Sequence, residues 1–559
     1  MSGPVAAPWR ASFPDAADWD AVLTSGTVPA LLDDAVAAHG DRPAIEFRDR
    51  RISFRALGEA VDALAAGLLR QGIGAGDAVA LYLPNTPWHP VAFFAVARTG
   101  ARIVHLSALD APRELAFKLR DSGARTLIAT NLPGLLPTAL RLLEEDAAGL
   151  LLIGDDMQWG AGPVEPLVVP WGDKVRPLPH ADAPSAWPAL DQETVCVVQY
   201  TGGTTGLPKG AMLSHRNLTA AVSMYRSLRE SPPVRGGEER VITVLPLFHI
   251  FALTTLLLRH IADGNELLLR TRFDVPTLLA DIGQRRATIF SGVPTMWIAL
   301  ANHPDAPACD FSSLRLCGSG GAPMPFEVEQ RIRRMTGRQF YTGWGMTETS
   351  PAGTRTPPGE PSTPGLIGIP LPGIELRVVD RLDPSRVLPP DEPGELAIRG
   401  PNVFKGYWNR PQETAVSFHD GFFLTGDIGV MDARGLFRIL DRKKNMIISS
   451  GFNVYPAAVE NAIYEHPDIA EAIVIGIPDT YRGQAAKAFV TLRAGAPGLS
   501  LEALIAFLAD RIGRHEMPVA LEVRDSLPRS PAGKLLAKAL QDEEQAKVAA
   551  AVRPTDGGQ

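Results

Sequence analysis

Apolar residues in the first part of the chain gather in short continuous runs, with longer amphipathic segments between them. Leu57 to Gln71 carries apolar residues at helical spacing, whereas Asp77 to Leu83 is apolar almost throughout and ends at Pro84. Further runs of the second kind are Ile103 to Leu106, Thr126 to Ala129, Val241 to Leu245, Glu266 to Arg270, Ala287 to Phe290 and Leu314 to Cys317. Strands that are apolar on both faces are typical of parallel sheets covered by helices. The pattern therefore predicts an α/β fold with mainly parallel sheets flanked by helices.

The alternation of apolar runs and amphipathic segments ends between Pro351 and Pro372, in a stretch dense in Pro, Gly and Thr. From about residue 373 the chain reads as short strands and turns, which predicts a β-rich subdomain over about 373–441. The last unit has the order helix, strand, strand, helix and its own apolar positions, which is typical of a small α+β domain. We therefore expect a large N-terminal domain over 1–441 and a small C-terminal domain over 442–559.

Composition narrows the class of protein. The chain has 559 residues, of which 45% are hydrophobic and 21% charged, as in soluble globular proteins with a large core. A net charge of -7 gives no sign of nucleic-acid binding, since such proteins usually carry a basic face. The three cysteines lack metal-ligand spacing. We find no signal peptide and no apolar run long enough to span a membrane, so we expect a cytoplasmic protein. A peripheral membrane contact and a homodimer are left open.

The most informative stretch is Tyr200-Thr-Gly-Gly-Thr-Thr-Gly-Leu-Pro-Lys-Gly210. It follows the strand-like run Thr194 to Gln199, and Ser214 after it is placed to cap a helix that begins at His215. A Gly/Thr-rich turn at a strand end can direct several N–H groups and hydroxyls at one anion, with a lysine charge beside it. A flexible surface turn is the alternative, which four glycines, three threonines and one lysine disfavour. The stretch predicts a nucleotide phosphate site, although it lacks the Walker A spacing.

Four other stretches contain residues suited to ligand binding or catalysis. They are Gly318 to Pro323, Tyr341 to Glu348, Thr425-Gly-Asp427, and Asp441 to Ile447 continued by Ser450 to Pro456. Glycines allow close approach of the backbone to a flat ligand, and a carboxylate near phosphates commonly holds Mg²⁺. Taken singly, each stretch also fits an ordinary turn, cap or solvated basic segment.

In this order, and with Pro528-Arg-Ser-Pro-Ala-Gly-Lys534 after them, these stretches resemble the adenylate-forming superfamily of acyl-CoA synthetases, adenylation domains and luciferases. The resemblance extends from about Leu31 to Lys538. Within the superfamily the chain is most similar to bacterial medium- and long-chain fatty acid–CoA ligases. The resemblance implies a large N-terminal domain, a small mobile C-terminal domain and a two-step reaction with Mg²⁺, ATP and CoA. A carboxylate first forms acyl-AMP and pyrophosphate, and the CoA thiol then displaces AMP.

The resemblance also implies roles for individual residues. ATP or AMP would be bound by Thr201, Gly202, Gly203, Thr204, Thr205, Gly206, Lys209, Gly320, Gly321, Ala322, Pro323, Gly343, Trp344, Gly345, Met346, Thr347, Asp427, Arg442 and Lys534. Among these, Lys534 and Thr347 would act at the α-phosphate, and Asp427 and Arg442 would hold the ribose. Glu348 and Thr204 would bind Mg²⁺. CoA would be bound by Ser450, Gly451 and Phe452, and Lys444 would be the hinge between the domains.

The acyl pocket is expected at His249 and the apolar helix after it, Ile250 to Leu258, with Phe290, Val293, Met296 and Trp297 as further candidate walls. The resemblance makes His249 a catalytic or pocket residue, and a histidine satisfied in the core is the alternative. No Asp follows Leu247-Phe248, which argues against amino-acid substrates because their ammonium group needs an acidic partner.

Trp344 stands where long-chain ligases more often carry Tyr, so the acyl chain length stays open. The alternatives within the fold are a dicarboxylic or aryl acid–CoA ligase and a luciferase-like oxygenase. The alternative outside catalysis is a nucleotide-binding scaffold, which the presence of Lys534, Glu348 and Asp427 disfavours.

Overall fold

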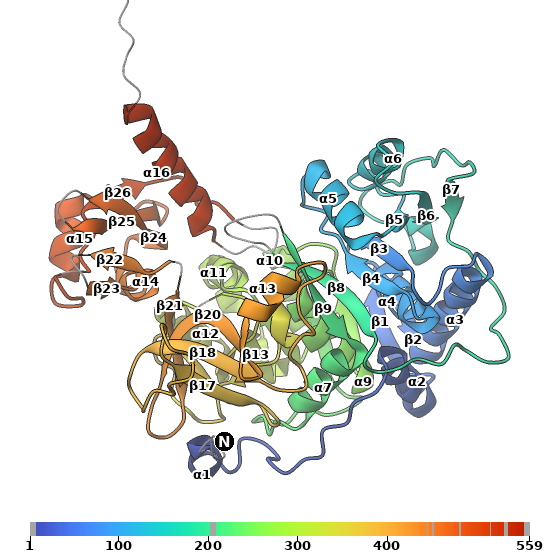
Figure 1. The fold of residues 1–559 in the computed structure, drawn as a ribbon, viewed down its shortest axis with the longest axis horizontal. Helices are drawn as coiled ribbons and strands as arrows, with labels where there is room; N and C mark the ends of the chain where they lie inside the picture. Colours follow the sequence, from blue (N-terminus) through green and yellow to red (C-terminus); the bar gives the residue numbers. More distant parts are fainter. Residues whose placement is uncertain are drawn as a thin grey trace, which may run out of the picture.

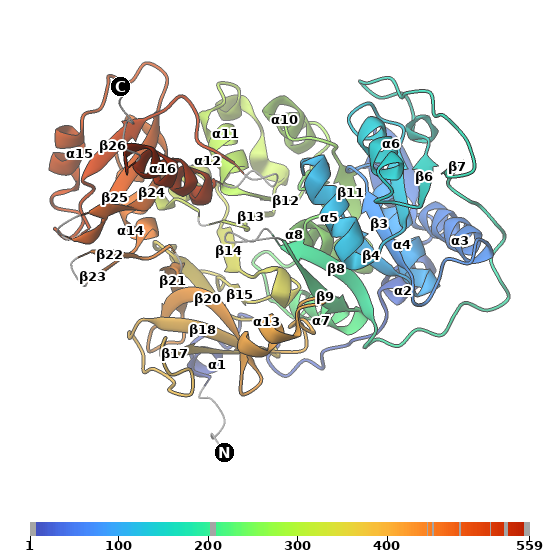
Figure 2. The same cartoon turned by 45° about the horizontal axis from the view of Figure 1, so that its top comes forward.

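The computed structural model describes residues 7–201, 208–322, 324–443, 445–449, 452–479, 482–514, 516–529 and 535–552. The chain folds into a large part that carries two extended sheets and a small C-terminal part, which lie at opposite sides of the views in Figures 1 and 2. This confirms the predicted α/β class with a smaller second unit. The domain boundaries at 441 and 442 stay predictions.

The first sheet contains the predicted strand after Asp77. Its order is β7-β6-β5-β3-β4-β8-β9, and all neighbours are parallel except β8 and β9. The strands are β3 (Ala78–Tyr82), β4 (Arg102–His105), β5 (Thr126–Thr130), β6 (Leu150–Gly154), β7 (Val175–Pro177), β8 (Val195–Thr201) and β9 (Lys209–Ser214). The antiparallel hairpin of β8 and β9 holds the ends of the predicted phosphate turn together.

The second sheet is parallel in its middle part, whereas β2 pairs antiparallel with β1 at one edge and the strands from β15 onwards are antiparallel. From one edge its order is β2-β1-β11-β10-β12-β13-β14-β15-β16-β21-β20-β18-β17, with β19 beside β20. The strands of the first half are β1 (Pro43–Phe47), β2 (Arg50–Ser53), β10 (Arg240–Thr243), β11 (Glu266–Leu269), β12 (Ile289–Gly292), β13 (Leu316–Ser319) and β14 (Phe340–Trp344). The antiparallel half confirms the predicted β-rich region and contains β15 (Thr354–Arg355), β16 (Leu366–Pro370), β17 (Glu375–Val379), β18 (Gly394–Arg399), β19 (Phe418–His419), β20 (Phe422–Met431) and β21 (Phe437–Arg442).

Side-chain alternation along the strands shows how the layers are stacked. In β3, Val79 and Leu81 belong to the core between the two sheets, whereas Ala80 and Tyr82 face a second core on the outer side. The central layer contains α2 (Val28–His39), α3 (Phe54–Arg70), α4 (Trp88–Thr99), α7 (His215–Arg226), α8 (Ile250–Ala252), the π-helical segment η2 (Leu253–Leu258) and α9 (Arg259–Ala262). Every residue of α4 is buried, as expected of a helix between two sheets.

The outer faces of both sheets are also covered by helices. The first sheet carries α5 (Pro112–Ser122) and α6 (Leu136–Glu144), and the second carries α10 (Val275–Gly283), α11 (Pro294–Asn302) and α12 (Phe326–Thr336). Shorter elements are α1 (Pro8–Ser12), η1 (Asp156–Trp159), η3 (Ala306–Ala308), η4 (Phe311–Ser313), η5 (Thr347–Thr349) and α13 (Pro411–Val416). Within the described ranges, none of these helices combines the length and apolar character needed to span a membrane.

The predicted helix start at Ser214 is confirmed. The backbone N–H of Asn217 donates to Ser214 Oγ (3.1 Å), and the N–H of Ser214 donates to Asn217 Oδ1 (2.9 Å). This reciprocal capping box satisfies N–H groups at the first turn of α7. It also fixes the end of β9, so the phosphate turn has a strand on each side and a capped helix after it.

The small C-terminal part has the predicted α+β composition. It contains β22 (Ile447–Ser449), β23 (Phe452–Val454), β24 (Ile469–Asp479), β25 (Gly483–Leu492) and β26 (Ala520–Val523), with α14 (Pro456–Tyr464), α15 (Leu501–Leu508) and α16 (Ala537–Val552). Apolar side chains of α14, α15, β24 and β25 form a core of their own, which allows this part to be stable as a unit.

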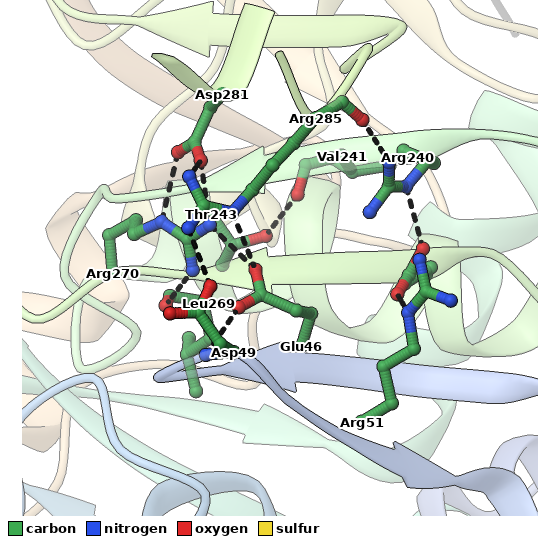
Figure 3. Close-up of polar contacts among 11 residues, drawn as sticks. Glu46, Asp49, Arg51, Arg240, Val241, Thr243, Leu269, Arg270, Asp281 and Arg285 are labelled. Carbon is green, nitrogen blue, oxygen red and sulfur yellow. Dashed lines mark hydrogen bonds and ion pairs between the residues drawn. The ribbon is translucent and has the colours of Figure 1, made fainter. Parts of the chain in front are cut away.

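A buried ion network joins two neighbouring strands of the second sheet, β1 and β11, to α10 on its outer face (Figure 3). Arg270, directly after β11, contacts Asp281 of α10 through Nη2 (2.6 Å) and Nε (2.9 Å), and Glu46 of β1 through Nη2 (2.6 Å). Asp281 is fully buried and Glu46 nearly so. Because an isolated buried carboxylate is very costly, Arg270 holds both acids in place.

Arg270→Ala should lower the free energy of unfolding by about 3–5 kcal/mol, because it leaves two buried carboxylates without their main partner. The measurement is the midpoint of urea unfolding followed by far-UV circular dichroism. Arg141→Ala is the control, since Arg141 forms an exposed pair with Glu145 (2.7 Å) and such pairs contribute about 1 kcal/mol or less. Equal losses in both variants would contradict the structural role given to Arg270.

Candidate active site

A cavity of about 650 Å³ lies at the carboxyl ends of the central strands of the second sheet, beside the β8–β9 hairpin. Ligands of α/β proteins commonly bind at this edge, because loops and helix starts meet there. The residues of this cavity that the sequence had singled out are Thr201, Lys209, His249, Gly320, Gly321, Gly343, Trp344, Gly345, Met346, Thr347, Glu348 and Arg442.

The phosphate turn is held at both ends by strand pairing. Thr201 of β8 lies opposite Lys209 of β9, and Gly202 to Gly206 between them fall outside the described residues. Lys209 forms an ion pair with Glu413 of α13, and its Nζ lies 5.2 Å from the ring centroid of Tyr407. A bound phosphate would therefore have to compete with Glu413 for this lysine, and the predicted phosphate contacts of the turn stay predictions.

The glycines of the predicted adenine pocket have a structural reason of their own. A Cβ at Gly345 would lie 1.4 Å from the carbonyl oxygen of Pro351, and one at Gly343 would lie 2.5 Å from that of Thr354. A Cβ at Gly320 would lie 2.8 Å from Cζ of Phe251. The backbone packing of this chain thus already requires these glycines, independently of any ligand. Half-buried Ala322 follows Gly321, and Pro323 lies outside the described residues.

Three predicted site residues from three strands meet at Asp427. Arg442 of β21 lies opposite Asp427 of β20, and its Nε is 2.6 Å from Asp427 Oδ1. The indole N–H of Trp344, at the end of β14, donates to Asp427 Oδ2 (2.7 Å). Asp427 is 1% exposed, so the carboxylate is positioned by its neighbours and by the sheet. A carboxylate fixed in this way can accept hydrogen bonds from vicinal hydroxyls.

Glu348 is a second buried carboxylate at the cavity, and it lies in η5. The hydroxyl of Tyr407 donates to Glu348 Oε1 (2.8 Å). Burial raises the pKa of Glu348, while the hydrogen bond from Tyr407 acts in the opposite direction. Tyr407 is held beside β9 by backbone hydrogen bonds of its neighbours, from Met212 N to Gly406 O (2.9 Å) and from Trp408 N to Gly210 O (2.7 Å).

The donor set around Glu348 fits Mg²⁺ bound together with nucleotide phosphates. A carboxylate oxygen is a ligand that Mg²⁺ prefers, and this ion usually takes one or two protein carboxylates and completes its shell with phosphate and water. Among the described residues, no group of three or more His, Cys, Asp or Glu side chains is arranged as a metal site. Such a site would therefore depend on the nucleotide, and Thr204, the other predicted ligand, lies outside the described residues.

Tyr407→Phe should move the acid limb of the pH profile of kcat/KM for ATP to higher pH by about one unit. The hydroxyl stabilises the ionised form of Glu348, and a hydrogen bond to a charged group contributes about 1.5 kcal/mol or more. Removing it raises the pKa of Glu348 further, so the ionised carboxylate is lost earlier as pH falls. Tyr82→Phe, in β3, is the control. An unchanged acid limb would show that Glu348 does not set it.

His249 lines the cavity and also caps a helix, while its catalytic role stays a prediction. It precedes α8, where its Nδ1 accepts a hydrogen bond from the N–H of Phe251 (3.3 Å), and its half-buried side chain lines the cavity. The predicted single helix after it is wrong in detail, since η2 has π-helical hydrogen bonding between α8 and α9. π-Helical turns often occur at functional sites, because the extra residue shifts the face that each side chain covers.

Two of the expected acyl-pocket walls face the other side of the sheet. Phe290 and Trp297 belong to the core under α10, α11 and α12. The neighbours of Phe290 in β12, Ile289 and Ser291, line the cavity instead, because successive side chains of a strand point to opposite faces. For Phe290 the prediction was therefore wrong by one residue along the strand, whereas Trp297 lies in α11 on the outer face of the sheet.

Several predicted residues of the C-terminal part cannot be placed. Lys534, Lys444, Ser450 and Gly451 lie outside the described residues, and of Phe452 only the backbone, in β23, is described. Their catalytic, hinge and CoA-binding roles stay predictions. Residues that sequence reasoning missed are Tyr407, Arg259 and Arg355, which line the cavity. A single tyrosine or arginine outside a motif gives no local signal that its side chain reaches the cavity.

Comparison with known families agrees with this geometry. The model of the family described as AMP-binding enzyme matches residues 32–408, and the model described as AMP-binding enzyme C-terminal domain matches residues 458–534. The chain belongs to the AMP-binding enzyme family. The family match covers the phosphate turn, the glycine-rich strand ends and Glu348, and the C-terminal match ends at Lys534.

Individual relatives of this AMP-binding enzyme cover nearly its whole length. A long-chain-fatty-acid–CoA ligase from Escherichia coli O6:H1 is 38% identical over 536 residues, which are 93% of this chain and 94% of the relative. One from Bacillus subtilis (strain 168) is 35% identical over 96% of this chain and 98% of the relative. Among solved structures, ATP-bound MatB from Rhodopseudomonas palustris superposes with a TM-score of 0.81 at 27% identity, covering 93% of this chain and 99% of MatB.

Proposed function

We propose that this AMP-binding enzyme is an AMP-forming acyl-CoA ligase that activates a medium- to long-chain fatty acid. The observation that carries the proposal is a cavity lined by Trp344 and Arg442, which both contact the buried Asp427, and by Glu348 and Tyr407, which are hydrogen-bonded to each other. The same cavity continues along α8, η2 and α9, where an acyl chain can lie. The names of the full-length relatives support this substrate class.

In the first step an oxygen of the substrate carboxylate attacks the α-phosphorus of ATP. The bond between the α-phosphorus and the bridging oxygen of the β-phosphate breaks, and pyrophosphate leaves. Such a displacement depends mainly on positioning and on charge stabilisation. We assign Asp427 and Arg442 to the ribose, Trp344 to the adenine face and Thr347 to the α-phosphate. Thr201 to Lys209 would hold the departing pyrophosphate, and Lys534 would bridge the carboxylate and the α-phosphate.

Glu348, with Thr204, is the proposed protein ligand of Mg²⁺. The ion would supply charge neutralisation on the phosphates of ATP when it is bound. The part of this chain is to keep Glu348 ionised and oriented, which the hydroxyl of Tyr407 does through its hydrogen bond to Oε1.

In the second step the sulfur of CoA attacks the acyl carbon of acyl-AMP, a thioester bond forms, and AMP leaves. We propose that the small domain, residues 442–559, rotates about Lys444 between the steps, withdrawing Lys534 and presenting Gly451 and Phe452 to CoA. One site then performs two reactions by exchanging the residues that cover it. Arg442, the first residue of this small domain, is held by Asp427 of the large domain and would fix the chain just before the hinge.

The test is a panel of straight-chain acids from acetate to palmitate, incubated with ATP, Mg²⁺ and CoA and scored for AMP and pyrophosphate. We expect AMP, pyrophosphate and an acyl-CoA in equal amounts for medium- or long-chain members. Release of ADP, or AMP formation that does not depend on the acid, would overturn the proposal.

A further inference from the structure

The cavity has a limb that descends along the inner face of the second sheet. On one side it is lined by Phe251, Thr255 and Arg259, which follow one another at intervals of four residues along α8, η2 and α9. The other side is lined by alternate residues of two strands: Ile289 and Ser291 of β12, and Leu316 and Gly318 of β13, continued by Gly320. An acyl chain that enters beside Phe251 therefore runs along this helical segment towards Arg259.

The far end of this limb carries two arginines. Arg259 contacts Glu230 through Nη2 and Oε2 (2.8 Å) and through Nη1 and Oε1 (3.3 Å). Arg355 of β15 donates from Nη2 to the same Oε1 (3.1 Å). The Arg259 side chain is 7% exposed, that of Arg355 is 16% exposed, and both line the cavity. Glu230 is buried between them.

Hydrogen bonding at these arginines is incomplete. Within the described part of the chain, the buried Nε atoms of Arg259 and Arg355 have no hydrogen-bond partner. A guanidinium has five N–H donors, and the single carboxylate of Glu230 has two oxygens to offer to both side chains. Most protein interiors avoid such a deficit of acceptors.

The charges around the far end do not cancel. Asp263 lies 3.9 Å from Arg259 Nε and 2.9 Å from Nε of Arg226. Arg226, Arg259 and Arg355 thus face Glu230 and Asp263, which leaves one positive charge in excess. The other titratable groups packed here are Tyr225, Tyr341 and His260. Burial and the charge of Arg259 lower the pKa of His260 well below its usual value, so it adds no charge at neutral pH.

We propose that Arg259 and Arg355 form a second anion site at the far end of the acyl limb, which selects carboxylic acids that carry a second carboxylate at the opposite end of the chain. The inference rests on the proposed ligase chemistry and changes the preferred substrate from a monocarboxylic fatty acid to an α,ω-dicarboxylic acid. The first carboxylate would lie at the nucleotide end of the cavity and react with ATP. The second would accept hydrogen bonds from the two guanidinium groups and balance the excess charge.

The preference for dicarboxylic acids follows from the hydrogen-bond donors of the two arginines that each end group of the acid leaves without an acceptor. A methyl end would displace water from two guanidinium groups without giving them an acceptor, which costs free energy. A carboxylate forms charge-assisted hydrogen bonds with arginine, often two at once. Sites built to hydrogen-bond a substrate group reject analogues that lack it far more strongly than apolar pockets reject a chain that is one methylene shorter or longer.

The experiment compares straight-chain monocarboxylic and α,ω-dicarboxylic acids of equal length, from six to sixteen carbons, in AMP release with ATP, Mg²⁺ and CoA. For the full-length wild-type enzyme we expect kcat/KM to be at least tenfold higher for the dicarboxylic acid at the best length. Arg355→Met should remove this preference, lowering kcat/KM for the dicarboxylic acid at least tenfold while that for the monocarboxylic acid stays equal or rises. Glu230 keeps Arg259 as its partner in this variant, so the protein is expected to fold.

Arg226→Met is the matched control. It removes the same charge from the same ion network, but Arg226 is half exposed and pairs with Asp263 outside the cavity. We expect it to leave the preference for dicarboxylic acids within about threefold of wild type. An equal loss in both variants would show a long-range effect of charge and overturn the proposed contact.

Two further outcomes separate this inference from the ligase proposal. Efficient turnover of monocarboxylic acids, with no dicarboxylic preference and no effect of Arg355→Met on the ratio, would overturn the anion site and leave the ligase function intact. If no acid yields AMP, the ligase function fails, and binding of the dicarboxylic acids by calorimetry decides the anion site. Binding that Arg355→Met weakens at least tenfold would support the site, and equal binding would overturn it.

Discussion

Lys534→Ala should lower the rate of acyl-adenylate formation by about 10²–10³, the loss typical when one preorganised charge at a transition state is removed. The reason is that Lys534 is the residue proposed to neutralise both the attacking carboxylate and the α-phosphate. The thioester step should be largely retained, because the proposed rotation withdraws Lys534 before CoA reacts. The measurements are pyrophosphate release from acid and ATP, and acyl-CoA formation from supplied acyl-AMP and CoA.

Lys538→Ala is the control for this prediction. Lys538 follows closely in the same terminal segment, lies in α16 and forms a surface ion pair with Asp542 (2.6 Å). Surface pairs of this kind contribute little, so both half-reactions should stay near the wild-type rates. Equal loss of both half-reactions in Lys534→Ala would contradict its assignment to the first step alone.

The fold could be predicted from the sequence wherever a single local pattern decides an element. The run Asp77 to Leu83 became β3, and the amphipathic segment Leu57 to Gln71 forms most of α3. Strand β9 was missed because Lys209 to Ser214 has no alternation of its own and is extended through its pairing with β8. The π-helical segment η2 was missed for a related reason, since its apolar residues also fit an α-helix.

The site could be predicted only where residues stand in recognisable motifs. Trp344, Asp427 and Arg442 come from three such motifs, and the structure brings them into contact. Tyr407, Arg259 and Arg355 were missed because each reaches the cavity through packing between segments far apart in the sequence. Phe290 was expected in the wall of the acyl pocket, but its side chain points to the other face of the sheet. An apolar run does not reveal which residues point to which face when both faces of the strand are buried.

The contacts of Asp427 give the strongest structural support for nucleotide binding. Both of its oxygens face the cluster that includes Trp344 and Arg442. Two hydroxyls of a ribose would each donate to this carboxylate, and a hydrogen bond to a charged group contributes about 1.5–3 kcal/mol. Asp427→Ala should therefore lower kcat/KM for ATP by at least about 10², mainly through KM.

Measuring the thermal stability of Asp427→Ala distinguishes a loss of nucleotide binding from unfolding of the protein. The Arg442 side chain is 42% exposed, so water can hydrate it when Asp427 is removed, whereas the indole N–H of Trp344 loses a buried partner. One such loss costs about 1–3 kcal/mol, which should lower Tm by a few degrees and leave the protein folded. Glu375→Ala is the control, because it removes an exposed pair with Arg399 in the same β-rich region (2.6 Å). It should change neither KM nor Tm appreciably.

The decisive measurement compares ATP with 2′-deoxy-ATP and 3′-deoxy-ATP. If Asp427 holds the ribose, the wild-type enzyme should prefer ATP over each deoxy analogue by at least about tenfold, the value of one hydrogen bond to a charged group. The preference should shrink to about one in Asp427→Ala, since neither hydroxyl then has its carboxylate partner. A variant that is less stable but discriminates among the three nucleotides as the wild type does would show that Asp427 only positions Trp344 and Arg442.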